Sequence, residues 1–161
     1  MPRNPAVIEV RRVDDDKSVA SARALFREYA AAVARDLSLQ DFGRELAELP
    51  GEYAPPRGAL LLANCGGRLA GCVALRPLSD DACEMRRLFV RHQFRGKGVG
   101  KRLALAVIET ARDGGYRAVR LNLAPWMEEA IVIYRTLGFR PIEPYRPDHV
   151  NGLVFMELPL H

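Results

Sequence analysis

The sequence predicts a single α/β domain in which a mixed β-sheet is covered by helices. Strand-like and helix-like segments follow one another along the chain in the order β-α-α-β-β-β-α-β-α-β-β, which is typical of this class. The 161 residues are too few for two domains of ordinary size, and a hydrophobic content of 48% is sufficient for a packed core. We therefore expect residues 1–161 to form one domain.

Seven segments are predicted to be strands, because hydrophobic and β-branched runs are bounded there by turn residues. The first run mixes β-branched with charged side chains, as an exposed edge strand does. Gly66-Gly67 separates the second run from the third and indicates a hairpin, and Ser79-Asp80-Asp81 leads into the fourth. The predicted strands cover residues 7–13, 59–63, 68–76, 83–90, 118–123, 139–142 and 153–158.

Four segments are predicted to be helices. The carboxylates of residues 14–16 suit the N-cap and first turn of the first helix, whereas the second helix has weaker signals. In the third, Val99, Leu103 and Val107 recur on one face before a Gly-Gly pair, and Tyr134 lies on the apolar stripe of the fourth. The predicted helices cover residues 17–34, 39–48, 98–112 and 127–137.

Composition argues against several classes of protein. No apolar run approaches the roughly 18 to 20 residues that a membrane span needs, and the start of the chain does not resemble a secretory signal. Three cysteines without a C-x-x-C pair favour neither a disulfide framework nor a zinc site, and the three histidines lack ligand spacing. We expect a reduced, cytoplasmic protein without a metal. The net charge of +4 is compatible with an anionic partner but does not identify one.

The most informative segment runs through Arg95, Gly96, Lys97, Gly98, Val99, Gly100 and Lys101, where the third predicted helix begins. Main-chain N–H groups at a helix start, together with the positive end of the helix dipole, form a site for anions. Glycines allow phosphate oxygens to approach the main chain, and Arg95, Lys97 and Lys101 add positive charge. The segment therefore predicts a pyrophosphate site.

Two nucleotide motifs do not fit this segment. A Walker loop would need glycine at Arg95 and a hydroxyl at Arg102, and a dinucleotide fingerprint would need glycine at Lys101. The pattern that does fit is R/Q-x-x-G-x-G/A, met by Arg95, Gly98 and Gly100. A glycine-rich helix start with a solvated basic face is the alternative interpretation.

The strand and loop from Cys83 to Lys101, with a second block from Ala130 to Phe139 that fits A-x-x-x-Y-x-x-x-G-F, resemble the GCN5-related N-acetyltransferase (GNAT) superfamily. The resemblance implies a mixed, mostly antiparallel sheet of about seven strands with about four helices. It also implies that acetyl-CoA lies in a gap where two central strands splay apart.

Several roles follow from the resemblance. The strand ending in Leu88, Phe89 and Val90 would hydrogen-bond the pantetheine arm through its main chain, and an amide near Leu88 or Phe89 would stabilise charge on the thioester oxygen. The alternative for these three residues is an ordinary core strand. Asn122 would contact pantetheine or would simply end its strand. Lys97, Lys101 and Arg102 are candidates for the phosphate charges of CoA.

Two side chains are candidates for proton transfer. Tyr134 would be a general acid for the departing thiolate, or else a half-buried core aromatic. Glu84 would be a general base for the amine, directly or through water, or else a strand glutamate paired with Arg86 or with a neighbouring basic residue. Without a bulge, strand alternation places Glu84, Arg86, Leu88 and Val90 on one face.

The resemblance thus implies an N-acetyltransferase that moves an acetyl group from acetyl-CoA to a primary amine of a small molecule or peptide. We expect it to act without a metal and to bind neither nucleic acid nor a membrane. A homodimer is compatible with this interpretation. A non-catalytic acyl-CoA-binding domain is the alternative. A nucleic-acid binder is less favoured, since the basic residues 86–102 include only two aromatics. The candidate acceptor walls hold polar groups without a substrate signature, namely Tyr29, Asp36, Tyr145, Asp148 and His149.

Overall fold

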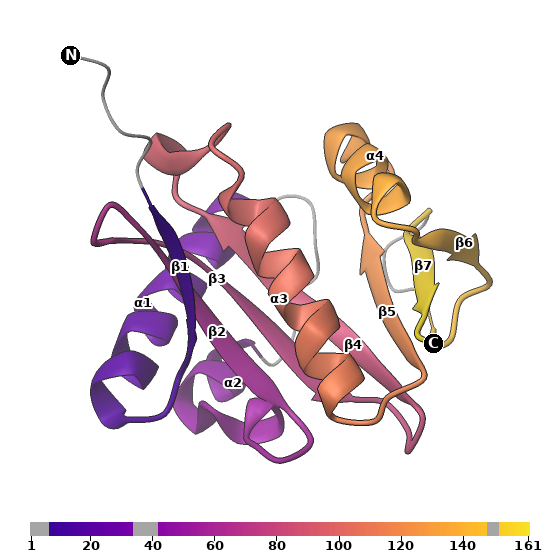
Figure 1. The fold of residues 1–161 in the computed structure, drawn as a ribbon, viewed down its shortest axis with the longest axis horizontal. Helices are drawn as coiled ribbons and strands as arrows, with labels where there is room; N and C mark the ends of the chain where they lie inside the picture. The colour runs from indigo at the N-terminus through magenta and orange to yellow at the C-terminus, as the bar shows by residue number, and fades with distance from the viewer. Residues whose placement is uncertain (1–6, 34–41, 148–151) are drawn as a thin grey trace.

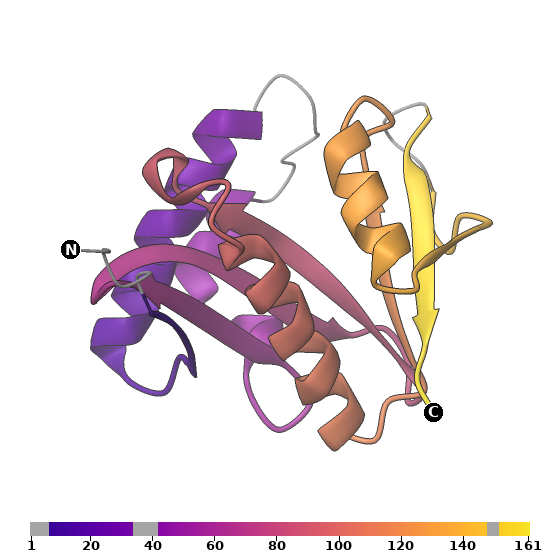
Figure 2. The same ribbon diagram turned by 45° about the horizontal axis from the view of Figure 1, so that its top comes forward.

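The computed structural model describes residues 7–33, 42–147 and 152–161, and within them an open seven-stranded sheet carries helices on both faces (Figures 1 and 2). The strand order is β1-β2-β3-β4-β5-β7-β6, and only the β4–β5 pair is parallel. The strands are β1 (Ile8–Arg12), β2 (Ala59–Cys65), β3 (Arg68–Pro77), β4 (Ala82–Val90), β5 (Ala118–Leu123), β6 (Arg140–Ile142) and β7 (Val154–Pro159). The helices are α1 (Asp16–Val33), α2 (Phe42–Glu48), α3 (Val99–Asp113) and α4 (Glu128–Thr136), with short 3-10 turns η1 (Gly51–Tyr53) and η2 (His92–Phe94).

This architecture confirms the predicted class and element order. Most boundaries agree with the predictions to within one or two residues. Residues 39–41, the predicted start of the second helix, lie outside the described residues. The two 3-10 turns were not predicted. Each of these turns has only three residues, too few for a periodic pattern to reveal.

Two hydrophobic layers hold the sheet between its helices. Leu61, on β2, belongs to the layer under α3, and its neighbours Leu60 and Leu62 belong to the layer under α1. The predicted stripe of α3 is buried as expected, and Leu25 and Phe26 of α1 are inaccessible to solvent. The alternation of β2 therefore gives both faces of this strand to the core, as expected of a strand covered on both sides.

The sheet opens between β4 and β5. Their parallel pairing joins Ala82 to Ala118, Cys83 to Val119 and Glu84 to Arg120, and then it stops although β4 continues to Val90. Figure 1 shows the two strands meeting at one end and diverging toward the other. The gap that the resemblance implied between two central strands is therefore present in the fold.

A bulge in β4 changes which way the end of this strand faces. The register pairs Cys72 with Phe89 and Ala74 with Arg86, so two residues of β4 oppose Val73 alone. Arg87, within the bulge, has a positive φ of 59°. As a result, Leu88 and Val90 pack against the layer under α3, whereas Glu84 and Arg86 contact groups on the α2 side. The condition under which Glu84, Arg86, Leu88 and Val90 were expected to share one face, a strand without a bulge, is therefore not met.

Candidate functional site

The glycine-rich loop leads from β4 through η2 into α3. Gly96 and Gly98 have positive φ angles of 76° and 88°, and Gly98 is the N-cap of the helix. The helix makes an early main-chain hydrogen bond from the Arg102 amide to the Gly98 carbonyl, at 3.1 Å. The preceding amides, of Val99 to Lys101, have no acceptor within the helix and are available to an anion.

The two loop glycines are required for their backbone conformation rather than for space. A Cβ placed on Gly96 or on Gly98 would meet no atom within 4 Å, so the loop is open on that side. The left-handed conformation itself is what other residues adopt only at a cost. The loop is thus open beside Lys97 and Lys101, and the diphosphate site that the sequence indicates here stays a prediction.

A cleft of about 650 Å³ occupies the gap between β4 and β5. Among the predicted site residues, it brings together Leu88, Asn122 and Tyr134. Phe89 and Val90 are not part of its wall. Phe89 packs edge-to-face on Tyr29, with ring centroids 6.4 Å apart, and Val90 packs against the layer under α3. Any contact of Phe89 and Val90 with a ligand would therefore be made by their main chain.

Tyr134 lies on the wall that α4 contributes to the cleft. Its side chain is buried, and its ring packs edge-to-face on Phe139 at a centroid distance of 5.5 Å. Burial, together with the nearby Tyr29, raises the pKa of Tyr134 well above that of an ordinary tyrosine. The hydroxyl is thus held in its neutral form, which is able to donate a proton.

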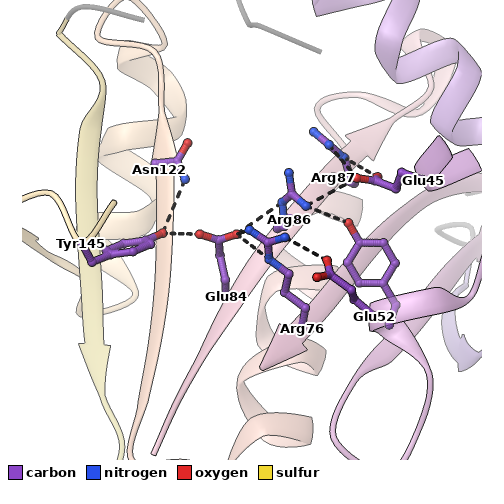
Figure 3. A network of polar contacts seen from close by, with 9 residues as sticks. Glu45, Glu52, Arg76, Glu84, Arg86, Arg87, Asn122 and Tyr145 are labelled. Carbon is purple, nitrogen blue, oxygen red and sulfur yellow. Dashed lines mark hydrogen bonds and ion pairs between the residues drawn. The ribbon is translucent and has the colours of Figure 1, made fainter. Parts of the chain in front are cut away.

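Glu84 is fully buried at the point where β4 and β5 part (Figure 3). Its Oε1 atom accepts a hydrogen bond from Nε of Arg76 at 3.1 Å, and it forms ion pairs with Nη2 of Arg76, at 2.9 Å, and with Nε of Arg86, at 3.3 Å. The hydroxyl of Tyr145 donates a short hydrogen bond to Oε2. The ion pair with Arg86, one of the two interpretations of Glu84, is therefore present, and Arg76 is an additional partner.

Tyr145 connects the two diverging strands. Its hydroxyl contacts Glu84 on β4 and accepts a hydrogen bond from Nδ2 of Asn122 on β5, at 3.4 Å. The ring is fixed edge-to-face on Phe155, with centroids 5.1 Å apart. Burial, and then the charge of Glu84, raises the pKa of Tyr145. The sequence placed Tyr145 in a candidate wall but carried no signal for this bridge.

A group of arginine–glutamate pairs forms the other side of the cleft, next to α2 and η1. Glu45 is bound by Arg87 at 2.9 Å through both of its oxygens, and Arg76 binds Glu52 at 2.9 Å. Burial disfavours ionisation of Glu45, but the hydrogen bonds and charges of Arg87 and Arg86 hold its pKa below the ordinary value. Sequence reasoning missed these pairs, because their members lie on separate elements.

The basic segment 86–102 is partly neutralised. Arg86 and Arg87 face Glu45, and Arg91 binds Glu28 at 2.8 Å. Among the polar residues proposed for the acceptor walls, Tyr29 lines the cleft, whereas Asp36, Asp148 and His149 lie outside the described residues. Within the described ranges, no cluster of three or more His, Cys, Asp or Glu side chains is arranged to hold a metal ion, and no helix is long and apolar enough to span a membrane.

Comparisons with known proteins agree with this geometry. Residues 21–139 match the model of the Acetyltransferase (GNAT) family. The chain is 31% identical over 156 residues to an uncharacterised N-acetyltransferase of Schizosaccharomyces pombe, and the match covers 96% of each chain.

Solved structures share the fold. An acetyltransferase of the GNAT family from Staphylococcus aureus superposes with a TM-score of 0.78 at 20% identity, covering 96% of this chain and all of the other. A GNAT family acetyltransferase from Elizabethkingia anophelis, solved with acetyl-CoA bound, gives a TM-score of 0.69 at 18% identity and covers 95% of this chain and 98% of the other.

Proposed function

The chain belongs to the acetyltransferase (GNAT) family, and from that premise we propose that it transfers the acetyl group of acetyl-CoA to a primary amine of a small molecule or peptide. One observation carries the proposal: a cleft lies in the gap between β4 and β5, and an anion cradle with an open face lies at the end of the same β4 strand. This arrangement suits a long ligand with a diphosphate at one end and a reactive group at the other.

The chain offers complementary groups for each part of acetyl-CoA, which supplies an acyl group activated as a thioester. The loop from Arg95 to Lys101, with the first amides of α3, would hold the diphosphate. The main chain of Leu88, Phe89 and Val90 would bind the pantetheine arm, because β4 lacks a paired strand on its β5 side beyond Glu84. An amide of Leu88 or Phe89 would donate to the thioester oxygen, and Asn122 would line the arm.

Tyr134 and Glu84 would move protons. The neutral hydroxyl of Tyr134 would donate a proton to the departing sulfur. Glu84 would receive the proton of the acceptor's ammonium group, and since its carboxylate has no exposed surface, the proton would reach it through the hydroxyl of Tyr145, which donates to Oε2. In that step the Tyr145 oxygen takes a proton from the ammonium while its own proton passes to Oε2 of Glu84, leaving a neutral amine and a carboxylic acid.

Release of free CoA thiol in the presence of a panel of primary amines tests the proposal. We expect amine-dependent thiol release together with mass gain of the acceptor, and a loss of kcat in Tyr134→Phe. Binding of acetyl-CoA by calorimetry with no thiol release would instead support the non-catalytic acyl-CoA-binding domain. Salt-dependent binding of DNA or RNA that acetyl-CoA does not displace would support a nucleic-acid binder.

A further inference from the structure

Resting on the proposed function, we propose that Arg86 and Arg146 form a carboxylate subsite at the mouth of the cleft. The acceptor would then be a primary amine that carries a carboxylate close to its amino group, as an α-amino acid does. Acetyltransferase activity by itself does not determine which charged groups the acceptor carries besides its amine.

The carboxylates that line the cleft in the described part of the chain are already occupied. They belong to Glu45, Glu48 and Glu52. Glu45 is bound by Arg87 through both oxygens, Glu48 by Arg44 at 3.0 Å and Glu52 by Arg76 at 2.9 Å. An acceptor whose only charges are ammonium groups, such as a polyamine, would have to break one of these pairs to gain a partner.

The cations are in excess, since five arginines line the same cleft. Arg86 is held more loosely than its neighbours: its contacts with Glu84, Glu45 and the Tyr53 hydroxyl measure 3.3, 3.4 and 3.2 Å, against 2.9 Å for the Arg87 pair. These contacts use Nε and Nη1 of Arg86. In the described part of the chain, its Nη2 has no hydrogen bond or ion pair. An N–H group of a guanidinium that has no other partner can donate a charge-assisted hydrogen bond to a carboxylate.

Arg146 lines the same cleft from a different segment of the chain. It lines the cleft together with Pro147, in the segment that follows β6, and it has no ion pair with any residue in the described ranges. Arg86 precedes Leu88 by two positions on β4, roughly 7 Å along a strand. A carboxylate held between the two arginines would therefore keep a neighbouring amine near the strand segment where the thioester is proposed to lie.

Matched acceptors test this subsite. We would compare L-amino acids with their primary amides, using aliphatic, aromatic and polar side chains, so that each pair differs only in the carboxylate. The expected kcat/KM is at least about 10-fold higher for the acid, because hydrogen bonds to a charged group discriminate by roughly 10- to 100-fold. Arg146→Gln should remove most of this preference and leave the rate with amides unchanged. Arg86→Gln should also reduce the preference, but it should change the rate with amides as well, because Arg86 is an ion-pair partner of Glu84.

Arg117→Gln is the control, since Arg117 is well exposed and does not line the cleft. Equal rates with acids and amides, or an acid preference that survives Arg146→Gln, would overturn the subsite while leaving the acetyltransferase intact. Absence of thiol release with every amine would instead refute the proposed function. In that case, binding of amino acids to the CoA-bound protein, measured by calorimetry, still tests the subsite. Binding to the wild type that is lost in Arg146→Gln would support the subsite, and undetectable binding to the wild type would overturn it.

Discussion

Replacing Gly98 by alanine isolates the role of the loop conformation. Gly98 has a φ of 88° and an added Cβ would meet no atom within 4 Å, so the substitution introduces backbone strain without a steric clash. A non-glycine residue in the left-handed region costs about 1–2 kcal/mol. If the loop of the variant keeps its conformation, this cost lowers the free energy of unfolding. If the loop relaxes, the same cost instead weakens the binding of the diphosphate, because the loop must return to the strained conformation to bind it.

These two outcomes have measurable sizes. Retention of the loop would lower Tm by about 2–8 °C, and relaxation would weaken the affinity for CoA by about 5- to 30-fold. Thermal unfolding and calorimetric titration with CoA together capture both. Gly67→Ala is the matched control, because Gly67 has a φ of 79° and equally open surroundings in the β2–β3 turn, and it should lose stability alone. Unchanged Tm and unchanged CoA affinity in Gly98→Ala would refute the reasoning.

Three further predictions concern the splay and the core around it. Tyr145→Phe should lower kcat by about 10²- to 10⁴-fold, because the hydroxyl is proposed to relay a proton. A fall in Tm with unchanged kcat would show instead that the Tyr145 hydroxyl has a structural role alone. Gly71→Ala should lower the free energy of unfolding by about 1–3 kcal/mol in urea titrations, because its Cβ would lie 2.4 Å from the Phe89 carbonyl oxygen; wild-type stability would contradict this. Burial raises the pKa of Tyr53 to about 12, so its folded form keeps a proton that the unfolded chain loses near pH 10. The free energy of unfolding should therefore fall between pH 10 and 12, and Tyr53→Phe should make this fall smaller.

The sequence could predict features that depend on neighbouring residues. Glycine at 96, 98 and 100 has few structural alternatives at a helix start, so the loop and the beginning of α3 were accessible to local reasoning. The order of the elements along the chain and the buried stripes follow from hydrophobic periodicity and turn residues in the same way. For this reason the element boundaries of the central sheet were predicted closely.

Features that depend on contacts between residues far apart in the chain could not be predicted from the sequence. The Tyr145 hydroxyl meets Glu84 across 61 residues of chain, and Arg87 meets Glu45 across 42. Arginine, glutamate and tyrosine side chains are common on strands and loops, so their types alone do not indicate which of them will pair. The bulge was missed for a similar reason, since Arg87 is neither glycine nor asparagine and local preferences disfavour it in the left-handed region.

The strained residue Arg87 helps to explain how the end of β4 is held beside the gap. The positive φ of Arg87 costs about 1–2 kcal/mol, and such a residue persists only where its surroundings fix it. Here the surroundings do so: the guanidinium makes two 2.9 Å hydrogen bonds to Glu45 and lies over the rings of Tyr29 and Phe42. The bulge thus anchors the end of β4 to α1 and α2, on the side of the sheet away from α3. Since β4 is held in this way and its pairing with β5 ends at Glu84, we expect the gap to be built by the chain itself, and binding in it to require little movement of the sheet.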